Sequence, residues 1–578
     1  MTFPTPNIDE SLTTSDYPFI GNFHKTLPHN QYGEVDAAAY RKFKGKCLEI
    51  EAGAPVNFEE VPAGPLLPPF NPGSDAKTIQ SAAKFTSPLA GAASEEHGPD
   101  PKDLEMRAAP EILSTSTAAE MTELYWMALL RDVPLASFAG NGLVATAVSD
   151  LNTAFNTALA SDATPGRLQL GLDLPENNGL LNLNHQTLFR CGLQDEEYGP
   201  LISQFFLRQI PYGVQTIDSR QIPYIREKDF LTSHSDWLRA QNTGKDKFGR
   251  DYANCNYYGD ELAGRETYYA GIFRYISTMR DLARFVNRDA LHQAYFNAAL
   301  FLDAIAAPLD NGNPYKGNLY SREANFATLG GPDLLTLVSE VASRALKVVW
   351  RQKWLVHRRA RPEVYGGLVQ MQCIGYECQQ RNYGLPGWVA GTEAAQRIRL
   401  HNANQNDGIE TLFLPMAFSA GSPNHPAYGA GHATVAGACV TVLKAWFDED
   451  AKLMELIAIA QESDRVKEPG QLQGLLQPGS HNSGELFDLP SPYTSNDANQ
   501  MTVGGELNKI ASNVAMGRSM GGVHWRTDNT RSLRLGEQIA IEILRKRSEE
   551  YAESPVSFTF RSFDRKIVHI TQGQVMYS

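Results

Sequence analysis

The stretch "PNHPAYGAGHAT" (residues 423–434) leads into the apolar run "VAGACVTVLKAWF", and this join predicts that a core helix begins near Gly431. The stretch holds two histidines, His425 and His432, among glycine, alanine and proline, with no carboxylate. Glycine lets an anion approach closely, and a helix N-terminus offers it free N–H groups. We therefore expect an oxyanion site here, with His432 beside it as a proton donor or acceptor.

Amphipathic helical periods lie on both sides of this stretch. They include "STAAEMTELYWMALLRDV" (116–133), "RETYYAGIFRYISTMRDLARFV" (265–286), "LHQAYFNAALFLDAIAAP" (291–308), a long run over 332–362 and "GELNKIASNVAMGRS" (505–519). Pro362 is expected to end the 332–362 helix, and the glycines 521 and 522 the 505–519 helix. The fold class predicted is all-α, with a large helical bundle as its core.

The two ends of the chain differ from this core in composition. Residues 1–110 are rich in proline, glycine and short polar stretches, which predicts an extended, irregular N-terminal arm and not an independent domain. The segment 551–578 alternates in the manner of strands and predicts a small C-terminal β-hairpin. The helical domain then spans 111–550, with its active site within 353–528.

Charge and hydropathy exclude several classes of function. A formal charge of −13 over 578 residues argues against nucleic acid or an anionic membrane as a partner. No run is long enough to span a membrane and no Sec-type signal is visible, so a soluble protein is expected. The six cysteines are too few for a disulfide scaffold; we expect Cys373 and Cys378 to be free thiols, with a local disulfide as the alternative.

Three segments place cationic or imidazole groups at predicted helix ends. They are "KWLVHRRARP" with Lys353 and Arg361, the opening stretch with His425 and His432, and "GRSMGGVHWRTD" with Arg518, His524 and Asp528. Each alone fits a solvated helix end. Together, in an acidic protein, they predict a pocket for a small tetrahedral or trigonal oxyanion.

The spacing of His524 and Asp528 suggests that the two side chains have different roles in one site. Asp528, four residues on, could hold the Nδ1 hydrogen of His524 and leave Nε2 free for a metal or an electrophile. Asp528 could equally cap the next helix, and the two roles are compatible.

Two other sequence patterns are weaker evidence for a function. "GRSMG" (517–521) matches the G-x-S-x-G of serine hydrolases, but its approach is helical and only His569 follows His524. Residues 310–318 have the composition of a calcium loop without its full pattern, and on that basis alone a structural calcium ion is predicted.

The motifs K-x7-R-P (Lys353 to Pro362), H-P-A-Y-x-A-G-H (His425 to His432) and R-S-M-G-G-V-H-x3-D (Arg518 to Asp528) resemble those of the vanadium-dependent haloperoxidases, which share a fold with a class of acid phosphatases. The likeness is closest to bromoperoxidases of the red-algal and cyanobacterial kind.

The resemblance implies vanadate as cofactor, with His524 binding vanadium through Nε2. It implies that Lys353, Arg361, Arg518 and the N–H of Gly431 hold the oxygens, that His432 contacts the opposite apical oxygen, and that Asp528 orients His524. His425 stands where the bromoperoxidases carry a second histidine, which favours bromide and iodide over chloride. The catalytic residues implied are His432, Lys353 and His524.

The activity implied is oxidation of bromide or iodide by hydrogen peroxide to hypohalous acid, which halogenates small organic acceptors. The alternatives are an acid phosphatase of the same superfamily, with His524 as nucleophile, and a decayed, non-catalytic anion-binding helical protein. A homodimer or larger homo-oligomer is expected from the family and from the arm.

One position departs from the family pattern. The family commonly has P-S-G-H where this chain has Gly429, Ala430, Gly431 and His432, so a serine hydroxyl is missing. Loss of a hydrogen bond to a charged group weakens a site by ~1.5 to 3 kcal/mol.

Overall fold

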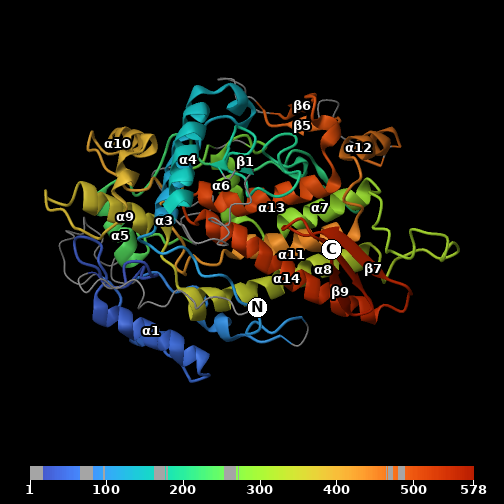
Figure 1. Cartoon of the computed structure of the whole chain (residues 1–578), viewed down its shortest axis with the longest axis horizontal. Coiled ribbons are helices and arrows are strands. Elements are labelled where there is room, and N and C mark those ends of the chain that lie inside the picture. The colour runs from blue at the N-terminus through green and yellow to red at the C-terminus, as the bar shows by residue number, and fades with distance from the viewer. Residues whose placement is uncertain are drawn as a thin grey trace.

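Four helices that carry or adjoin the motifs lie together in the middle of the molecule (Figure 1). They are α8 (Gly331–Arg351), α11 (Gly431–Trp446), α13 (Val503–Met520) and α14 (Arg526–Glu550), and α11 packs against the other three. Every residue of α11 except His432 is buried. Because a helix that is apolar on all sides must lie inside a protein, the run that opened the sequence analysis forms the centre of the core.

The structure is a computed structural model that describes residues 17, 19–64, 82–95, 98–161, 176–177, 180–252, 268–270, 273–463, 465–466, 473–479 and 489–578. Parts of the predicted N-terminal arm, residues 1–16 and 65–81, lie outside the described residues.

Two glycines allow α11 and α14 to cross at backbone contact. A Cβ atom on Gly437 would lie 2.0 Å from the carbonyl oxygen of Leu533, and one on Gly536 would lie 2.0 Å from that of Thr434. No side chain fits at such distances, so either substitution would push the two helices apart. This crossing fixes the N-terminal part of α11 relative to the start of α14, and both ends carry predicted site residues.

The remaining elements surround this centre, and the all-α prediction is confirmed. The other helices are α1 (Ala37–Glu51), α3 (Thr115–Leu129), α4 (Gly142–Ser161), α5 (His234–Thr243), α6 (Met279–Arg288), α7 (Gln293–Ala304), α9 (Pro362–Cys373), α10 (Glu393–Gln405) and α12 (Leu453–Glu462). Three two-stranded ribbons pair β1 (Glu176–Asn177) with β2 (Leu180–Leu181), β3 (Ile210–Tyr212) with β4 (Gln215–Ile217), and β5 (Leu476–Gln477) with β6 (Ser491–Pro492). None of the helices among the described residues combines the length and apolar character needed to cross a bilayer.

Among the described residues, the helix predicted over 265–286 begins later than expected, and residues 265–267 and 271–272 lie outside the described ranges. α6 begins only at Met279, where Thr278 and Asp281 form a capping box. Before it, Tyr269 and Arg274 make antiparallel bridges to Tyr224 and Gln221. The reciprocal cap fixes the helix start, and pairing with a distant segment holds the preceding residues extended.

The expected end of the helix over 332–362 is also corrected. α8 continues as a π-helical turn, η8 (Gln352–His357), which stops at Arg358 with φ 45°. Pro362 does not end this helix; it occupies the first turn of α9, and Arg361 is the N-cap. Proline suits a helix start because its missing N–H would have no partner there and its φ is already helical.

The N-terminal arm contains a helix that its composition did not indicate. α1 lies at the lower left edge of the molecule (Figure 1) and, with Phe23 and Phe85, packs Phe43 against Trp354 of η8 in a separate aromatic cluster. The arm is therefore packed against the segment that carries Lys353.

The C-terminal segment forms a small sheet with one strand more than the hairpin expected. β7 (Ser557–Arg561), β8 (Ile567–Thr571) and β9 (Gln574–Tyr577) pair antiparallel in that order, and β7 and β8 contact α11 and α14 (Figure 1).

Candidate active site

The three motif segments meet around one cavity of ≈ 210 Å³. Of the predicted residues, His425, Gly431, His432, Arg518 and His524 line it. Arg361 adjoins the cavity, because its guanidinium contacts both His425 and His524. Lys353 lies close by, with Nζ 5.7 Å from the ring of Trp350, which also lines the cavity. The structure thus brings all the predicted site residues together.

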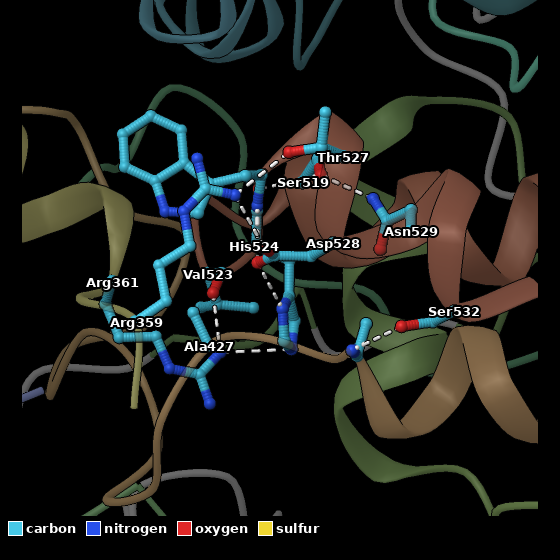
Figure 2. Close-up of polar contacts among 12 residues, drawn as sticks. Arg359, Arg361, Ala427, Ser519, Val523, His524, Thr527, Asp528, Asn529 and Ser532 are labelled. Atoms are coloured by element: carbon cyan, nitrogen blue, oxygen red, sulfur yellow. Dashed lines mark hydrogen bonds and ion pairs between the residues drawn. The ribbon is translucent and has the colours of Figure 1, made fainter. Parts of the chain in front are cut away.

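His524 is held between a carboxylate and a guanidinium (Figure 2). Its Nδ1 lies 3.0 Å from Oδ2 of Asp528, and its Nε2 lies 3.0 Å from Nη1 of Arg361. Burial and the neighbouring Arg361 hold the pKa of His524 well below its usual value, so the imidazole is neutral. With its one hydrogen on Nδ1, facing Asp528, His524 presents the lone pair of Nε2, which accepts from Arg361 in this structure and is the atom that could ligate a metal.

Asp528 fills both of the roles that the sequence left open. Oδ2 also accepts a hydrogen bond of 3.0 Å from the backbone N–H of Trp525, at the start of α14. Its other oxygen, Oδ1, lies 2.8 Å from Nη1 of Arg359, which in turn pairs with Glu120 of α3 at 2.9 Å. The side chains of Arg359, Asp528 and Glu120 are at most 4% exposed. A buried ion-pair chain that the sequence analysis missed therefore anchors the carboxylate behind His524, and Figure 2 shows its Arg359 and Asp528 members.

Three buried cations surround His524 without a matching carboxylate. Among the described residues, none of Lys353, Arg361 and Arg518 forms an ion pair with Asp or Glu, and all three side chains are at most 3% exposed. Burial holds the pKa of Lys353 well below its usual value and lowers that of Arg361 to about 9, so an anion beside them is needed to stabilise their charged forms. Uncompensated buried charge is costly unless a counter-ion is present. The cluster therefore fits a bound oxyanion.

The hydrogen bonds of these cations leave donors over for such an anion. Lys353 donates to the carbonyl oxygens of Pro426 (2.9 Å) and Ala427 (3.1 Å). Arg518 uses Nη1 for the hydroxyl of Tyr252 and the carbonyl of Val286, both at 2.8 Å, while its buried Nε has no partner among the described residues. A buried donor without an acceptor, beside the cavity, is available to a bound anion.

His432 has a carboxylate partner that was not predicted. Its Nε2 lies 3.0 Å from Oδ1 of Asp289, which directly follows α6. Burial lowers the pKa of His432, and Asp289 opposes that shift. An acidic residue just after a helix is unfavourable to the helix dipole, and that signal in "FVNRD" could have marked Asp289 as functional.

His425 and Trp350 form another part of the cavity lining. Their ring centroids are 5.0 Å apart, and Nδ1 of His425 lies 2.9 Å from Nη2 of Arg361. Burial, with Lys353 and Arg361 adding to it, keeps the pKa of His425 well below its usual value, so this ring is neutral as well. Trp350 precedes Lys353 on the same helix, but the sequence pattern alone did not distinguish it from core residues.

The helix start at Gly431 is as open as its sequence indicated. The N-cap, Ala430, has no side-chain cap, and its own N–H donates to Oγ of Ser532 at 2.8 Å. Ala430 is fully buried, and its side chain has no hydroxyl where the family pattern has a serine.

The geometry does not support the serine hydrolase pattern at residues 517–521. Ser519 lies inside α13 and donates to the backbone of His524, and His569 pairs with Thr559 in the C-terminal sheet, so these residues form no serine–histidine pair.

Cys373 and Cys378 are free thiols, as expected. Within the described ranges no group of three or more His, Cys, Asp or Glu side chains could hold a metal ion, so the calcium ion suggested at residues 310–318 gains no support there and stays a prediction.

A helical core that gathers a lysine and two arginines without paired carboxylates beside a buried histidine defines a class of helical enzymes that bind a small oxyanion between their core helices. Comparison with known proteins specifies the class further. The family model described as the VCPO second helical-bundle domain matches residues 334–553.

Individual relatives match nearly the whole chain. The chain is 31% identical to the vanadium-dependent bromoperoxidase of Corallina officinalis, over 96% of this chain and 92% of that one. It is 30% identical to the vanadium-dependent bromoperoxidase of Ascophyllum nodosum, over 97% and 88%. The homohexameric structure of a second vanadate-dependent bromoperoxidase from Ascophyllum nodosum superposes with a TM-score of 0.77 at 27% identity, covering 100% of this chain and 89% of that one. The chain therefore belongs to the vanadium-dependent bromoperoxidase family.

Proposed function

We propose that this protein holds vanadate and uses hydrogen peroxide to oxidise bromide or iodide to hypohalous acid, which then halogenates small organic acceptors. The observation that carries the proposal is the set of three buried cations around Nε2 of a neutral His524, with no carboxylate paired to them in the described residues. A pocket of this kind suits a negatively charged metal oxide, because the anion supplies the missing counter-charge and accepts the spare donors.

Each residue of the cluster has a proposed part in binding. His524 would ligate vanadium through Nε2, with Asp528 fixing its tautomer and orientation. The side chains of Lys353, Arg361 and Arg518, with the N–H of Gly431, would hold the oxygens. These donors come from η8, α9, α13 and α11, so the bundle itself sets their positions.

Bound vanadate supplies a Lewis-acidic centre that activates peroxide without storing electrons. The protein supplies the proton transfers and the electrostatic field. His432, hydrogen-bonded to Asp289, would take a proton from incoming peroxide and return one to the departing oxygen. Lys353 would stabilise the negative charge that develops as halide attacks.

The side of the cavity formed by Trp350 and His425, which we call the halide wall, would receive the halide. A neutral imidazole and an indole form a weakly polar surface, and the nearby Arg361 and Lys353 attract an anion to it. Bromide and iodide, which are large and easily desolvated, suit such a surface better than chloride.

A parallel assay tests the proposal. Protein incubated with orthovanadate, hydrogen peroxide and bromide should brominate an added phenol, and the rate should depend on vanadate and on bromide. Hydrolysis of a phosphate ester without vanadate, in the absence of bromination, would favour the phosphatase alternative. Neither activity would favour a decayed anion-binding protein.

We further infer that the protein works in solution as a homodimer or a larger assembly. The homohexameric relative supports this. Sedimentation of the purified protein tests it, and a monomer at micromolar concentration would contradict it. Elemental analysis of the same sample would report vanadium and would also test for the structural calcium ion.

A further inference from the structure

Thr86 of the N-terminal arm makes hydrogen bonds to both segments that carry the halide wall. The backbone N–H of Thr86 donates to the carbonyl of Asn424 at 3.0 Å, and its carbonyl accepts from Nε1 of Trp350 at 3.2 Å. Asn424 immediately precedes His425. One peptide segment of the arm thus joins the two residues whose rings form the wall.

The side chain of Asn424 is held by the same arm. Its Nδ2 donates to the carbonyl of Ala83 at 2.9 Å and to Oγ1 of Thr26 at 3.3 Å, and the residue is 5% exposed. Asn424 does not line the cavity, whereas Pro423 and His425 on either side of it do. Its contacts therefore set the position of the loop without meeting the halide.

A buried lysine of the arm fixes the loop just before this point. Nζ of Lys25 pairs with Oε1 of Glu363 at 2.8 Å and donates to the carbonyls of Ala420 (2.9 Å) and Ser422 (2.7 Å). Oε2 of Glu363 accepts from the N–H of Ser422 at 2.7 Å. Because Glu363 lies two residues after Arg361, these bonds tie the arm, the start of α9 and the loop of His425 into one unit.

Other contacts of the arm lie elsewhere and provide a comparison. Glu34 accepts from Arg381 at 2.9 Å and from the hydroxyl of Tyr383 at 2.9 Å, and Tyr32 donates to Gln379 at 2.6 Å. None of these residues lines the cavity. They hold the arm to the segment after α9, so they can be weakened without touching the halide wall.

We propose that residues 25–26 and 83–86 form a clasp that positions the halide wall, so that the N-terminal arm determines halide affinity. The claim about halide affinity rests on the proposed function. The claim that the clasp positions Trp350 and His425 does not depend on it. Asn424 and Thr86 are positioning residues: they act through His425 and Trp350 and touch no reacting atom. If the arm served stability alone, loosening it at Asn424 and at Glu34 would have the same consequences.

The test compares Asn424→Ala with Glu34→Gln in the full chain. For Asn424→Ala, which removes both hydrogen bonds of Nδ2 to the arm, we expect the bromide KM to rise about fivefold, with kcat and vanadate affinity within about twofold of wild type. For Glu34→Gln we expect an unchanged bromide KM and a lower Tm. An unchanged KM in Asn424→Ala, or an equal rise in both variants, overturns the proposal.

A second readout separates the clasp from the proposed function. Amide hydrogen exchange of the vanadate-free protein should be faster over residues 421–430 in Asn424→Ala and unchanged there in Glu34→Gln. If the wild type shows no bromide oxidation, the proposed function fails, and exchange alone still decides whether the clasp exists. Should Asn424→Ala not fold, Thr86→Pro removes the N–H that donates to Asn424 and is measured in the same way. Equal exchange in variant and wild type overturns the clasp.

Discussion

The two sides of the cavity are held in place by different physical means. The side formed by Arg361, Arg518 and His524, which we call the anion wall, is built from core helices and from charges buried within the bundle. The halide wall of Trp350 and His425 is tied to the N-terminal arm mainly by single hydrogen bonds of Thr86 and Asn424, with one buried ion pair, Lys25–Glu363, at the loop before His425. Both walls share Arg361, which contacts a histidine on each side.

This difference suggests how one pocket can keep its cofactor while its halide preference changes. The buried ion pairs of Arg359 behind the anion wall are costly to break, so that wall should tolerate little variation. Single hydrogen bonds to an arm contribute about 1 kcal/mol each, so the halide wall can shift by small steps. Changes behind the anion wall should therefore act on stability and vanadate affinity, and changes at the clasp on halide affinity.

The largest effect is expected behind the anion wall, at Arg359. Arg359→Met would leave Glu120 and Asp528 buried without their shared cation, and breaking a buried pair costs about 3 to 5 kcal/mol of stability. Urea denaturation followed by circular dichroism measures the loss. Arg397→Met is the matched control, because its pair with Glu393 is about 40% exposed on both sides and should be worth less than about 1 kcal/mol. Equal losses in the two variants would contradict the account.

The next largest effect is expected for Asp528→Asn, which changes the residue that orients His524. An amide can still accept from Nδ1 of His524 but carries no charge, so vanadate affinity should fall by roughly 10- to 100-fold. Calorimetric titration with orthovanadate measures it, with Asp333→Asn as the control, since Asp333 binds Tyr551 and Leu329 away from the cavity. A bromide KM that rises while vanadate affinity stays constant would reverse the assignment of the walls.

Ala430→Ser should have the smallest effect and the opposite sign. It restores a hydroxyl beside Gly431, and one hydrogen bond to a charged oxygen is worth ~1.5 kcal/mol, or about tenfold tighter vanadate. The same titration reads the change. Unchanged vanadate affinity would mean that a serine at position 430 does not contribute to vanadate binding in this chain.

The anion wall could be predicted from the sequence because its residues lie in short motifs with fixed spacing. Arg361, Arg518 and His524 stand close to glycine or proline at helix ends, and local rules identify such places. The pairing of His524 with Asp528 followed from a spacing of four residues. Even there, Pro362 was misread as a helix end, since proline also opens helices.

The partners that complete the site could not be predicted, because they are distant in the chain. Asp289 lies 143 positions from His432, and Glu120 lies 239 from Arg359. Thr86 acts through its backbone, which no side-chain pattern reveals, and Trp350 looks like any other core aromatic residue. Only the packing of the bundle and the arm brings these groups to the motifs.

Binding of orthovanadate to the vanadate-free protein, compared between wild type and His524→Ala, tests the central claim most directly. We predict one vanadate per chain for the wild type, at least about 100-fold weaker binding for His524→Ala, and no bromination by that variant at vanadate concentrations that saturate the wild type. Equal vanadate affinity in the two proteins, or bromination that survives the substitution, would contradict the claim that His524 and its buried cations hold the cofactor.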